Sequence, residues 1–183
     1  PYATMKVDRG KSEWGRFLSA AEVERIEKAE LPTETLDKAR DLFLMQCYTG
    51  LAYADLMECD FTKAELLDGM QVLTGVRHKT DVQYTIVLTP RAEAILRKYG
   101  GRLPKFSNQQ YNMRLKVMAD HCGIDRPIAS HWGRRTCGML LLNDGFPIEI
   151  VARVLGHADI RTTQTAYARI LDRTVAKAFK EKS

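Results

Sequence analysis

The feature that most constrains the fold is the order of the chain's periodic segments, because helical patterns enclose one short strand-like stretch. Apolar residues recur at helical spacing in segment 33–48, at Leu36, Ala39, Phe43 and Cys47. Segments 71–73 and 84–88 are strand-like and lie on either side of a polar stretch, which predicts a hairpin, or three strands if 65–67 joins. We therefore predict an α+β fold, mostly helical, with a small antiparallel β-sheet or hairpin.

Signals for helix starts and ends divide the chain further. Ser19 and Glu22 form a capping box, which predicts a short helix from there to about residue 29. Gly50 and Gly156 stand where a left-handed C-cap would end a helix, and Pro90 suits a first helical position. Further helices are predicted over 107–122, 130–143, 147–155 and 171–180, and the start of a short one over 52–57.

Composition excludes several classes of protein. Hydrophobic residues make up 45% and charged residues 28%, the balance of a globular domain rather than of a disordered tail. No apolar run approaches the ~20 residues of a membrane span, and the start has no signal-peptide pattern. The four cysteines form no C-x-x-C pair, so we expect free thiols, a cytoplasmic location and no metal site. The formal charge of +5 permits a polyanionic partner without proving one.

Residues 1–18 are polar and irregular, and the chain does not begin with Met. We interpret this segment as a linker or lead-in from a missing N-terminal region, and residues 19–183 as one domain.

Four places carry residues suited to chemistry on a phosphate. His131 and Arg134 share one helix face, and a helix N-terminus with an arginine fork makes a good phosphate seat, with Ser130 as the expected N-cap. His157 follows a glycine at a helix end, Tyr167 lies ten residues later, and Lys79 lies in the hairpin. Taken singly, these features have purely structural interpretations: His131 and Arg134 as a surface pair, His157 as a C-terminal cap, Tyr167 as a packed side chain and Lys79 as a turn residue.

As an ordered set these residues resemble the catalytic domain of the tyrosine recombinase (phage integrase) family, and in particular integrases of bacterial mobile elements. The resemblance covers nearly the whole chain and rests on ordered motifs: Phe17–Val23, Tyr48–Leu51 with Asp55, Arg77–Thr80, His131–Arg134, Gly145–His157 and Thr162–Tyr167.

The resemblance implies DNA cleavage and rejoining without a metal or nucleotide cofactor. Tyr167 would attack a backbone phosphate and form a 3′-phosphotyrosyl link, leaving a free 5′-hydroxyl. Arg134 and His157 would bind the non-bridging oxygens of the transition state, and His131 would contact the phosphate and help to take the tyrosine proton. Lys79 would protonate the leaving 5′-oxygen. The resemblance implies site-specific recombination or integration. Under it, residues 19–183 would be a tyrosine recombinase catalytic domain, and the missing N-terminal region would bind DNA.

The chain departs from the family pattern at two positions. Ala52 stands where the family has its first catalytic arginine, so another cation substitutes, or the protein is slow, or it does not catalyse. The candidate substitutes are Arg40, Arg77 and Arg135, although Arg40 would lie about 18 Å away along a continuous helix. The interval from His157 to Tyr167 is one residue longer than the family's. A flexible loop before the tyrosine would absorb the extra residue, whereas in a rigid helix it would turn the hydroxyl by about 100°.

The expected partner is double-stranded DNA. We expect an oligomer, a tetramer, to bind it, although a lone fragment could be monomeric. Basic residues near the C-terminus would contact the DNA backbone or simply form a solvated face: Arg161, Arg169, Arg173, Lys177, Lys180 and Lys182. Leu171, Val175 and Phe179 would cover the domain's own core or pack on a neighbouring protomer. Two alternatives stay open: a recombinase-like DNA-binding protein impaired at Ala52, and an unrelated helical scaffold whose five candidate residues do not converge.

Overall fold

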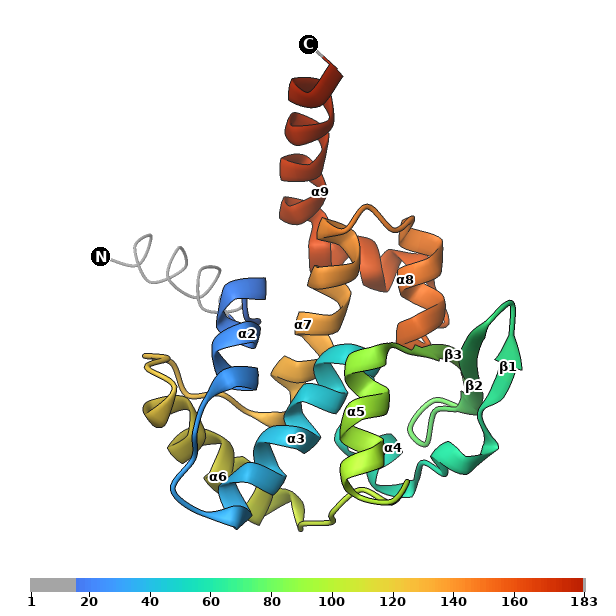
Figure 1. Ribbon diagram of the computed structural model, residues 1–183. Helices are drawn as coiled ribbons and strands as arrows, with labels where there is room; N and C mark the ends of the chain where they lie inside the picture. Colours follow the sequence, from blue (N-terminus) through green and yellow to red (C-terminus); the bar gives the residue numbers. More distant parts are fainter. Residues whose placement is uncertain (1–15, 183) are drawn as a thin grey trace.

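The computed structural model describes residues 16–182, without the side chains of 169–171, 173–174, 177–178 and 181–182. The fold is mostly helical, with one three-stranded antiparallel sheet at an edge of the molecule, which confirms the predicted fold class (Figure 1). The elements are α2 (Ala20–Lys28), α3 (Glu34–Thr49), α4 (Tyr53–Glu58), the 3₁₀ helix η1 (Phe61–Lys63), β1 (Glu65–Leu67), β2 (Met70–Val76), β3 (Gln83–Leu88), α5 (Pro90–Lys98), α6 (Asn108–His121), α7 (Ser130–Asn143), α8 (Ile148–Leu155) and α9 (Ile160–Lys182).

Helix α3 is the centre of the main core. Residues 41–47 are all buried, because α2, α5, α6 and α7 pack around this helix (Figure 1). Two buried polar groups are satisfied within this core: Gln46 donates to the carbonyl of Leu51 at 3.1 Å and accepts from the Tyr111 hydroxyl at 2.8 Å. Gln46 therefore holds the chain segment that follows α3 in a fixed position.

Most of the predicted helix starts are confirmed. Ser19 and Glu22 form the complete capping box, and the hydroxyls of Thr33, Thr89 and Ser107 each accept from the backbone N–H of the third residue of their helix. The predicted N-cap at Ser130 is wrong. Ala129 is the N-cap of α7 and Ser130 is already helical. The backbone N–H of Ser130 donates to Asn112 Oδ1 of α6 at 2.8 Å, so a side chain from another helix performs the capping.

The sheet has the order β1-β2-β3, so segment 65–67 does join the hairpin. Alternation along β3 buries Tyr84, Ile86 and Leu88 against the core. A Cβ at Gly75 on β2 would lie 2.3 Å from the Tyr84 hydroxyl oxygen, so the absence of a side chain there admits the tyrosine ring. The buried face of β3 thus packs the hairpin against the domain, whereas the connecting turn, residues 77–82, lies at the surface.

A second, smaller core joins α7, α8 and α9. It contains Met139, Leu142, Val151, Leu155 and Tyr167. Helix α9 runs from Ile160 to Lys182, so residues 171–180 are helical as predicted, but the helix starts eleven residues earlier and the loop predicted before Tyr167 is wrong. Its C-terminal part extends away from the rest of the molecule (Figure 1), where Val175 and Phe179 are exposed. None of the described helices is both long and apolar enough to cross a membrane.

Candidate active site

The first turn of α7 places His131 and Arg134 one turn apart. Gly133 between them lies against α3, where a Cβ would come within 2.6 Å of Gln46 Cβ. This close contact joins the start of α7 to α3. His131 stands exposed at the helix start, and its pKa is lowered by partial burial and by the charges of Arg135 and Arg16.

Arg134 crosses from α7 to the ends of two other helices. Its Nη1 donates to the carbonyl of Gly50, the C-cap of α3, at 2.8 Å, and its Nη2 donates to the carbonyl of Leu155 at the end of α8. Burial and the neighbouring charge of Arg77 lower its pKa to about 10, so the guanidinium is still cationic at neutral pH. Unpaired carbonyls at helix C-termini carry partial negative charge, which suits a cation.

His157 follows Gly156, the left-handed C-cap of α8 with φ of +62°. The imidazole is half-buried, and its Nδ1 lies 2.7 Å from Thr163 Oγ1 in the first turn of α9. Burial, reinforced by the charges of Arg134 and Arg77, lowers its pKa to about 4. His157 is therefore neutral at physiological pH.

Arg77 extends from the hairpin toward Gly156 and His157 at the end of α8. Its Nε lies 3.3 Å from Asp55 Oδ2 on α4, and the other Asp55 oxygen accepts from the backbone N–H of His78 at 2.8 Å. The side chain passes close to Gly156, where a Cβ would lie 2.8 Å from Arg77 Cδ. One buried carboxylate thus fixes both the arginine and the hairpin that carries it.

Tyr167 lies in a closed slot on α7. Its side chain is 4% exposed, and its hydroxyl donates to the backbone carbonyl of Arg135 at 3.2 Å. A Cβ at Gly138 would lie 2.3 Å from the hydroxyl oxygen. Burial and the neighbouring Cys137 raise the pKa of the phenol, although Arg134 and Arg135 oppose the shift.

The remaining candidates lie at different distances from this cluster. Lys79 is exposed in the hairpin turn, two residues beyond Arg77. Arg40 is engaged elsewhere: its Nη2 lies 2.6 Å from Asp37, its Nε 3.0 Å from Asp41, and its Nη1 donates to the carbonyl of Ala29. Ala52 is the N-cap of α4 and makes no side-chain cap.

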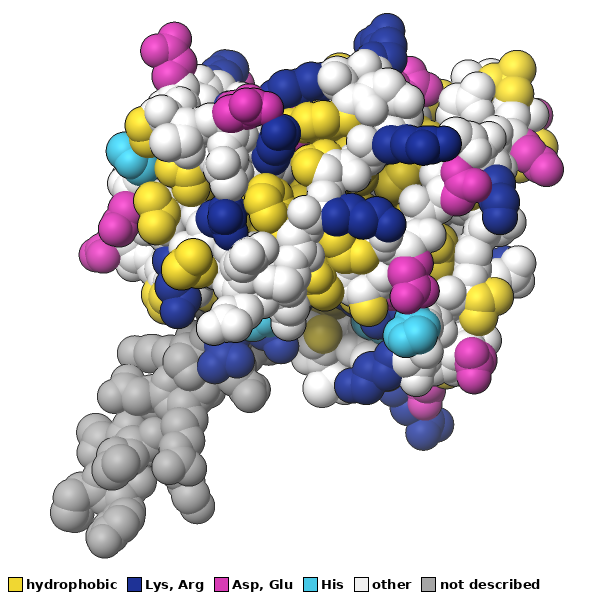
Figure 2. All heavy atoms as spheres, turned by 90° about the horizontal axis from the view of Figure 1, so that it is seen from below, with side chains coloured by type: hydrophobic (Ala, Val, Ile, Leu, Met, Phe, Trp, Pro, Cys, Tyr) yellow, Lys and Arg dark blue, Asp and Glu magenta, His cyan; other side chains and the backbone are white. Residues whose placement is uncertain are grey.

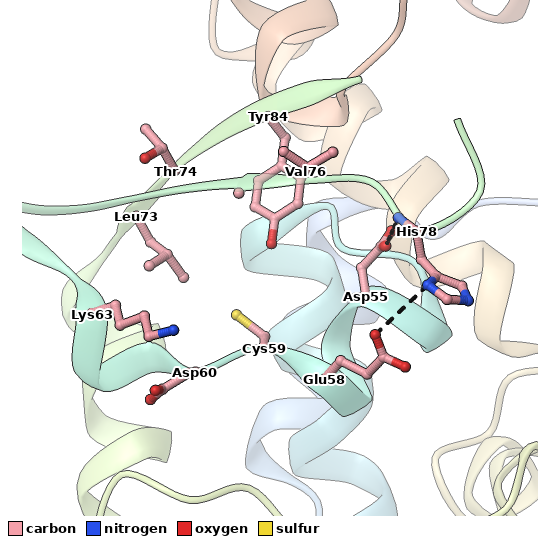
Figure 3. Close-up of a pocket in the computed structure, with 11 residues that line it drawn as sticks. Asp55, Glu58, Cys59, Asp60, Lys63, Leu73, Thr74, Val76, His78 and Tyr84 are labelled. Atoms are coloured by element: carbon pink, nitrogen blue, oxygen red, sulfur yellow. Dashed lines mark hydrogen bonds and ion pairs between the residues drawn. The ribbon is translucent and has the colours of Figure 1, made fainter. Parts of the chain in front are cut away.

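The other side of Asp55 borders a cavity of about 260 Å³ under the hairpin (Figure 3). Its lining includes Glu58, Asp60 and Lys63, and Glu58 pairs with His78 across its rim at 3.7 Å. Carboxylates outnumber the lysine, so this cavity does not suit a phosphate. No three metal-ligating side chains come together within the described part of the chain.

Sequence reasoning assigned no role to Asp55 or Thr163, although both lie in the motifs that carry the resemblance. Both are polar residues at buried positions: Asp55 is 7% exposed and Thr163 is 0% exposed. Burial could not be read at either position without the tertiary structure.

The profile of the phage integrase family matches residues 16–173. The chain belongs to this family. It is 29% identical over 171 residues to the tyrosine recombinase XerD of Listeria monocytogenes, covering 81% of this chain and 56% of that protein. It is 25% identical over 180 residues to XerC of Xylella fastidiosa, covering 90% and 60%. The chain thus spans little more than half the length of these relatives.

Solved structures of the family share the fold. XerH bound to palindromic difH substrate, a post-cleavage complex, superposes with a TM-score of 0.68 at 17% identity, covering 91% of this chain and 53% of that one. The catalytic domain of bacteriophage HP1 integrase superposes with a TM-score of 0.61 at 18% identity, covering 90% and 93%. At these identities the likeness establishes the fold alone.

On the face seen in Figure 2, the distribution of charge does not by itself mark a DNA surface. On the face opposite the projecting end of α9, Lys and Arg side chains are spread among apolar and acidic ones rather than gathered in one patch (Figure 2). Of the basic C-terminal residues, the side chains of Arg161 and Lys180 are described and exposed, whereas those of Arg169, Arg173, Lys177 and Lys182 lie outside the described residues. The location of the candidate phosphate-binding groups is therefore the stronger guide.

Proposed function

We propose that this chain is the catalytic part of a site-specific DNA recombinase that cleaves and rejoins strands through a 3′-phosphotyrosyl intermediate on Tyr167. The observation that carries the proposal is the meeting of Arg134, His157 and Arg77, which come from α7, the end of α8 and the hairpin. Three groups able to donate hydrogen bonds to one anion, held by buried partners, form a preorganised oxyanion site.

The roles follow from the chemistry of each group. Arg134 and His157 donate to the non-bridging oxygens, and a neutral His157 does so without adding a charge that must first be desolvated. His131, exposed in the first turn of α7, contacts the phosphate and helps to take the phenol proton. Lys79, in the hairpin turn, protonates the 5′-oxygen as it leaves. No nucleotide is needed, because the covalent intermediate conserves the energy of the broken ester. No metal is needed under this proposal, because the arginines supply the positive charge at the phosphate.

Arg77 replaces the arginine that the family has at the position of Ala52. Its guanidinium acts on Arg134 and His157 together, as the lowering of both their pKa values reflects. Arg40 is held by two aspartates and a backbone carbonyl, and Arg135 acts on His131 and Tyr167 instead. Asp55 prepositions Arg77, which is what a transition-state donor requires.

The buried state of Tyr167 is then a resting state. A phenol bonded to a carbonyl with a raised pKa is a poor nucleophile. Productive binding of DNA must draw Tyr167 out of its slot, which requires the start of α9 to shift or open. The additional residue between His157 and Tyr167 lies in this segment.

The natural partner under this proposal is double-stranded DNA in the bacterial cytoplasm, bound by a tetramer. The projecting end of α9, with Val175 and Phe179 exposed, supports contact between protomers. The alternative is a DNA-binding protein with impaired catalysis, which the lack of an arginine at Ala52 favours.

A covalent trapping assay separates the two. The full-length protein is incubated with nicked duplexes chosen from the DNA that flanks its gene, and SDS-resistant protein–DNA adducts are measured. We expect an adduct that Tyr167→Phe abolishes and that Arg77→Ala slows by about 100- to 1,000-fold. Arg40→Ala, checked for folding by circular dichroism, should slow it little. Binding without any adduct would establish the impaired alternative.

A further inference from the structure

Thr163 is buried at the junction that holds His157, and it performs no role in the chemistry described above. Its residue is 0% exposed, and its hydroxyl oxygen lies 2.7 Å from Nδ1 of the imidazole. Its neighbour Thr162 is exposed. A threonine hydroxyl excluded from water and placed against one ring nitrogen fixes which face and which nitrogen of the imidazole remain available.

A neutral imidazole has only one N–H, so its two nitrogens must divide the roles of donor and acceptor. Nδ1 is engaged with Thr163, which leaves Nε2 for a ligand. An anionic phosphate oxygen attracts an N–H and repels a bare nitrogen lone pair. The useful tautomer therefore carries its proton on Nε2, which requires Nδ1 to accept from the Thr163 hydroxyl.

We propose that Thr163 is a positioning residue that donates to Nδ1 of His157 and so keeps the proton on Nε2, aimed at the scissile phosphate. The inference rests on the proposed function for the identity of the ligand, but the tautomer itself is a property of the free protein. Thr163 also lies one helical turn before Tyr167 on α9. The segment that carries the nucleophile therefore sets the hydrogen bonding of His157 as well.

The structure supports a specific role rather than general packing. The β-branched side chain restricts the rotamer of the hydroxyl within the helix. Thr163 is buried and His157 is half-buried, so few water molecules can reach this bond as substitute donors. Burial, together with the charges of Arg134 on α7 and Arg77 on the hairpin, lowers the pKa of His157 and keeps the ring neutral, which makes the choice of tautomer decisive.

Two measurements test this inference. In the 15N-histidine-labelled chain at pH 7, two-bond correlation spectra distinguish a protonated from a bare ring nitrogen, and His157→Gln assigns the signals among the four histidines. We expect the Nε2–H form in the wild type and in Thr163→Ser, and a mixture of tautomers in Thr163→Val. Because the hydroxyl stabilises the neutral ring, the pKa of His157 should rise in Thr163→Val.

In the full-length protein, Thr163→Val should slow adduct formation by about tenfold, and Thr163→Ser should restore it. Thr162→Val is the matched control and should change neither measurement. An Nδ1–H tautomer in the wild type, or a serine variant as slow as the valine variant, would overturn the inference. If the wild type forms no adduct, the proposed function fails, while the spectra still decide whether Thr163 sets the tautomer.

Discussion

Replacing Gly138 by alanine tests whether the slot that holds Tyr167 is as closed as its geometry implies. Gly138 lies in the interior of α7, and a Cβ there would be 2.3 Å from the Tyr167 hydroxyl oxygen and 2.5 Å from its Cζ. These separations are far inside van der Waals contact, and the ring carbon belongs to a rigid group. The tyrosine must therefore leave the slot.

The two contributions to the free energy of unfolding have opposite signs. Alanine in place of glycine within a helix stabilises by about 1 kcal/mol. The Tyr167 side chain is 4% exposed in the slot, and moving it into water costs about 2–3 kcal/mol of hydrophobic stabilisation. Gly138→Ala should thus destabilise the domain by about 1–2 kcal/mol. In a Tyr167→Ala background the obstruction is absent, so the same change should stabilise by up to about 1 kcal/mol.

Urea unfolding followed by circular dichroism measures all four corners of this double-mutant cycle. The expected coupling between the two positions is about 2–3 kcal/mol, and the sign of the Gly138→Ala effect should reverse between backgrounds. An effect of the same sign and size in both backgrounds would refute the closed slot and, with it, the resting state inferred for Tyr167.

Three further predictions concern the cluster around Arg77. Asp55→Asn keeps an acceptor for the backbone but removes the charge, so adduct formation should slow by about tenfold in the trapping assay; Glu58→Gln, exposed on the same helix, should have no effect. Gly156→Ala forces a left-handed residue and a 2.8 Å contact with Arg77, so thermal unfolding should show a lower Tm and adduct formation should slow; a wild-type Tm would contradict this. His157 binds its proton only near pH 4, whereas the unfolded chain does so near 6.5, so the free energy of unfolding should fall as pH drops between these values. Urea titrations at pH 7 and 5 should show a smaller fall in His157→Gln, and an equal fall would contradict the neutral imidazole.

Local sequence was sufficient for the helices whose ends are determined by their own residues. The capping box at Ser19, the threonine before Pro90 and the glycine after α3 all act within one turn, so they could be identified without the fold. Ser130 shows where this fails. It resembles an N-cap in sequence, but Asn112 from α6 supplies the acceptor, and only packing brings that side chain to α7.

Helix α9 shows a second failure of local reasoning. Polar and β-branched residues at 161–165 weaken the helical signal, and the structure forms a helix there because Thr163 and Tyr167 are buried on one face. Burial against α7 and α8 outweighs propensity, and it also closes the slot around the tyrosine.

The sequence by itself determined the class of fold, the family and the candidate residues for the chemistry, because these depend on residue types and on their order along the chain. Tertiary structure decided which of the three candidate arginines stands beside Arg134 and His157, since the hairpin and α4 are brought together only by folding. It also decided that Tyr167 rests buried and that Thr163 faces His157. Distances between side chains on different elements depend on packing, and no local pattern encodes them.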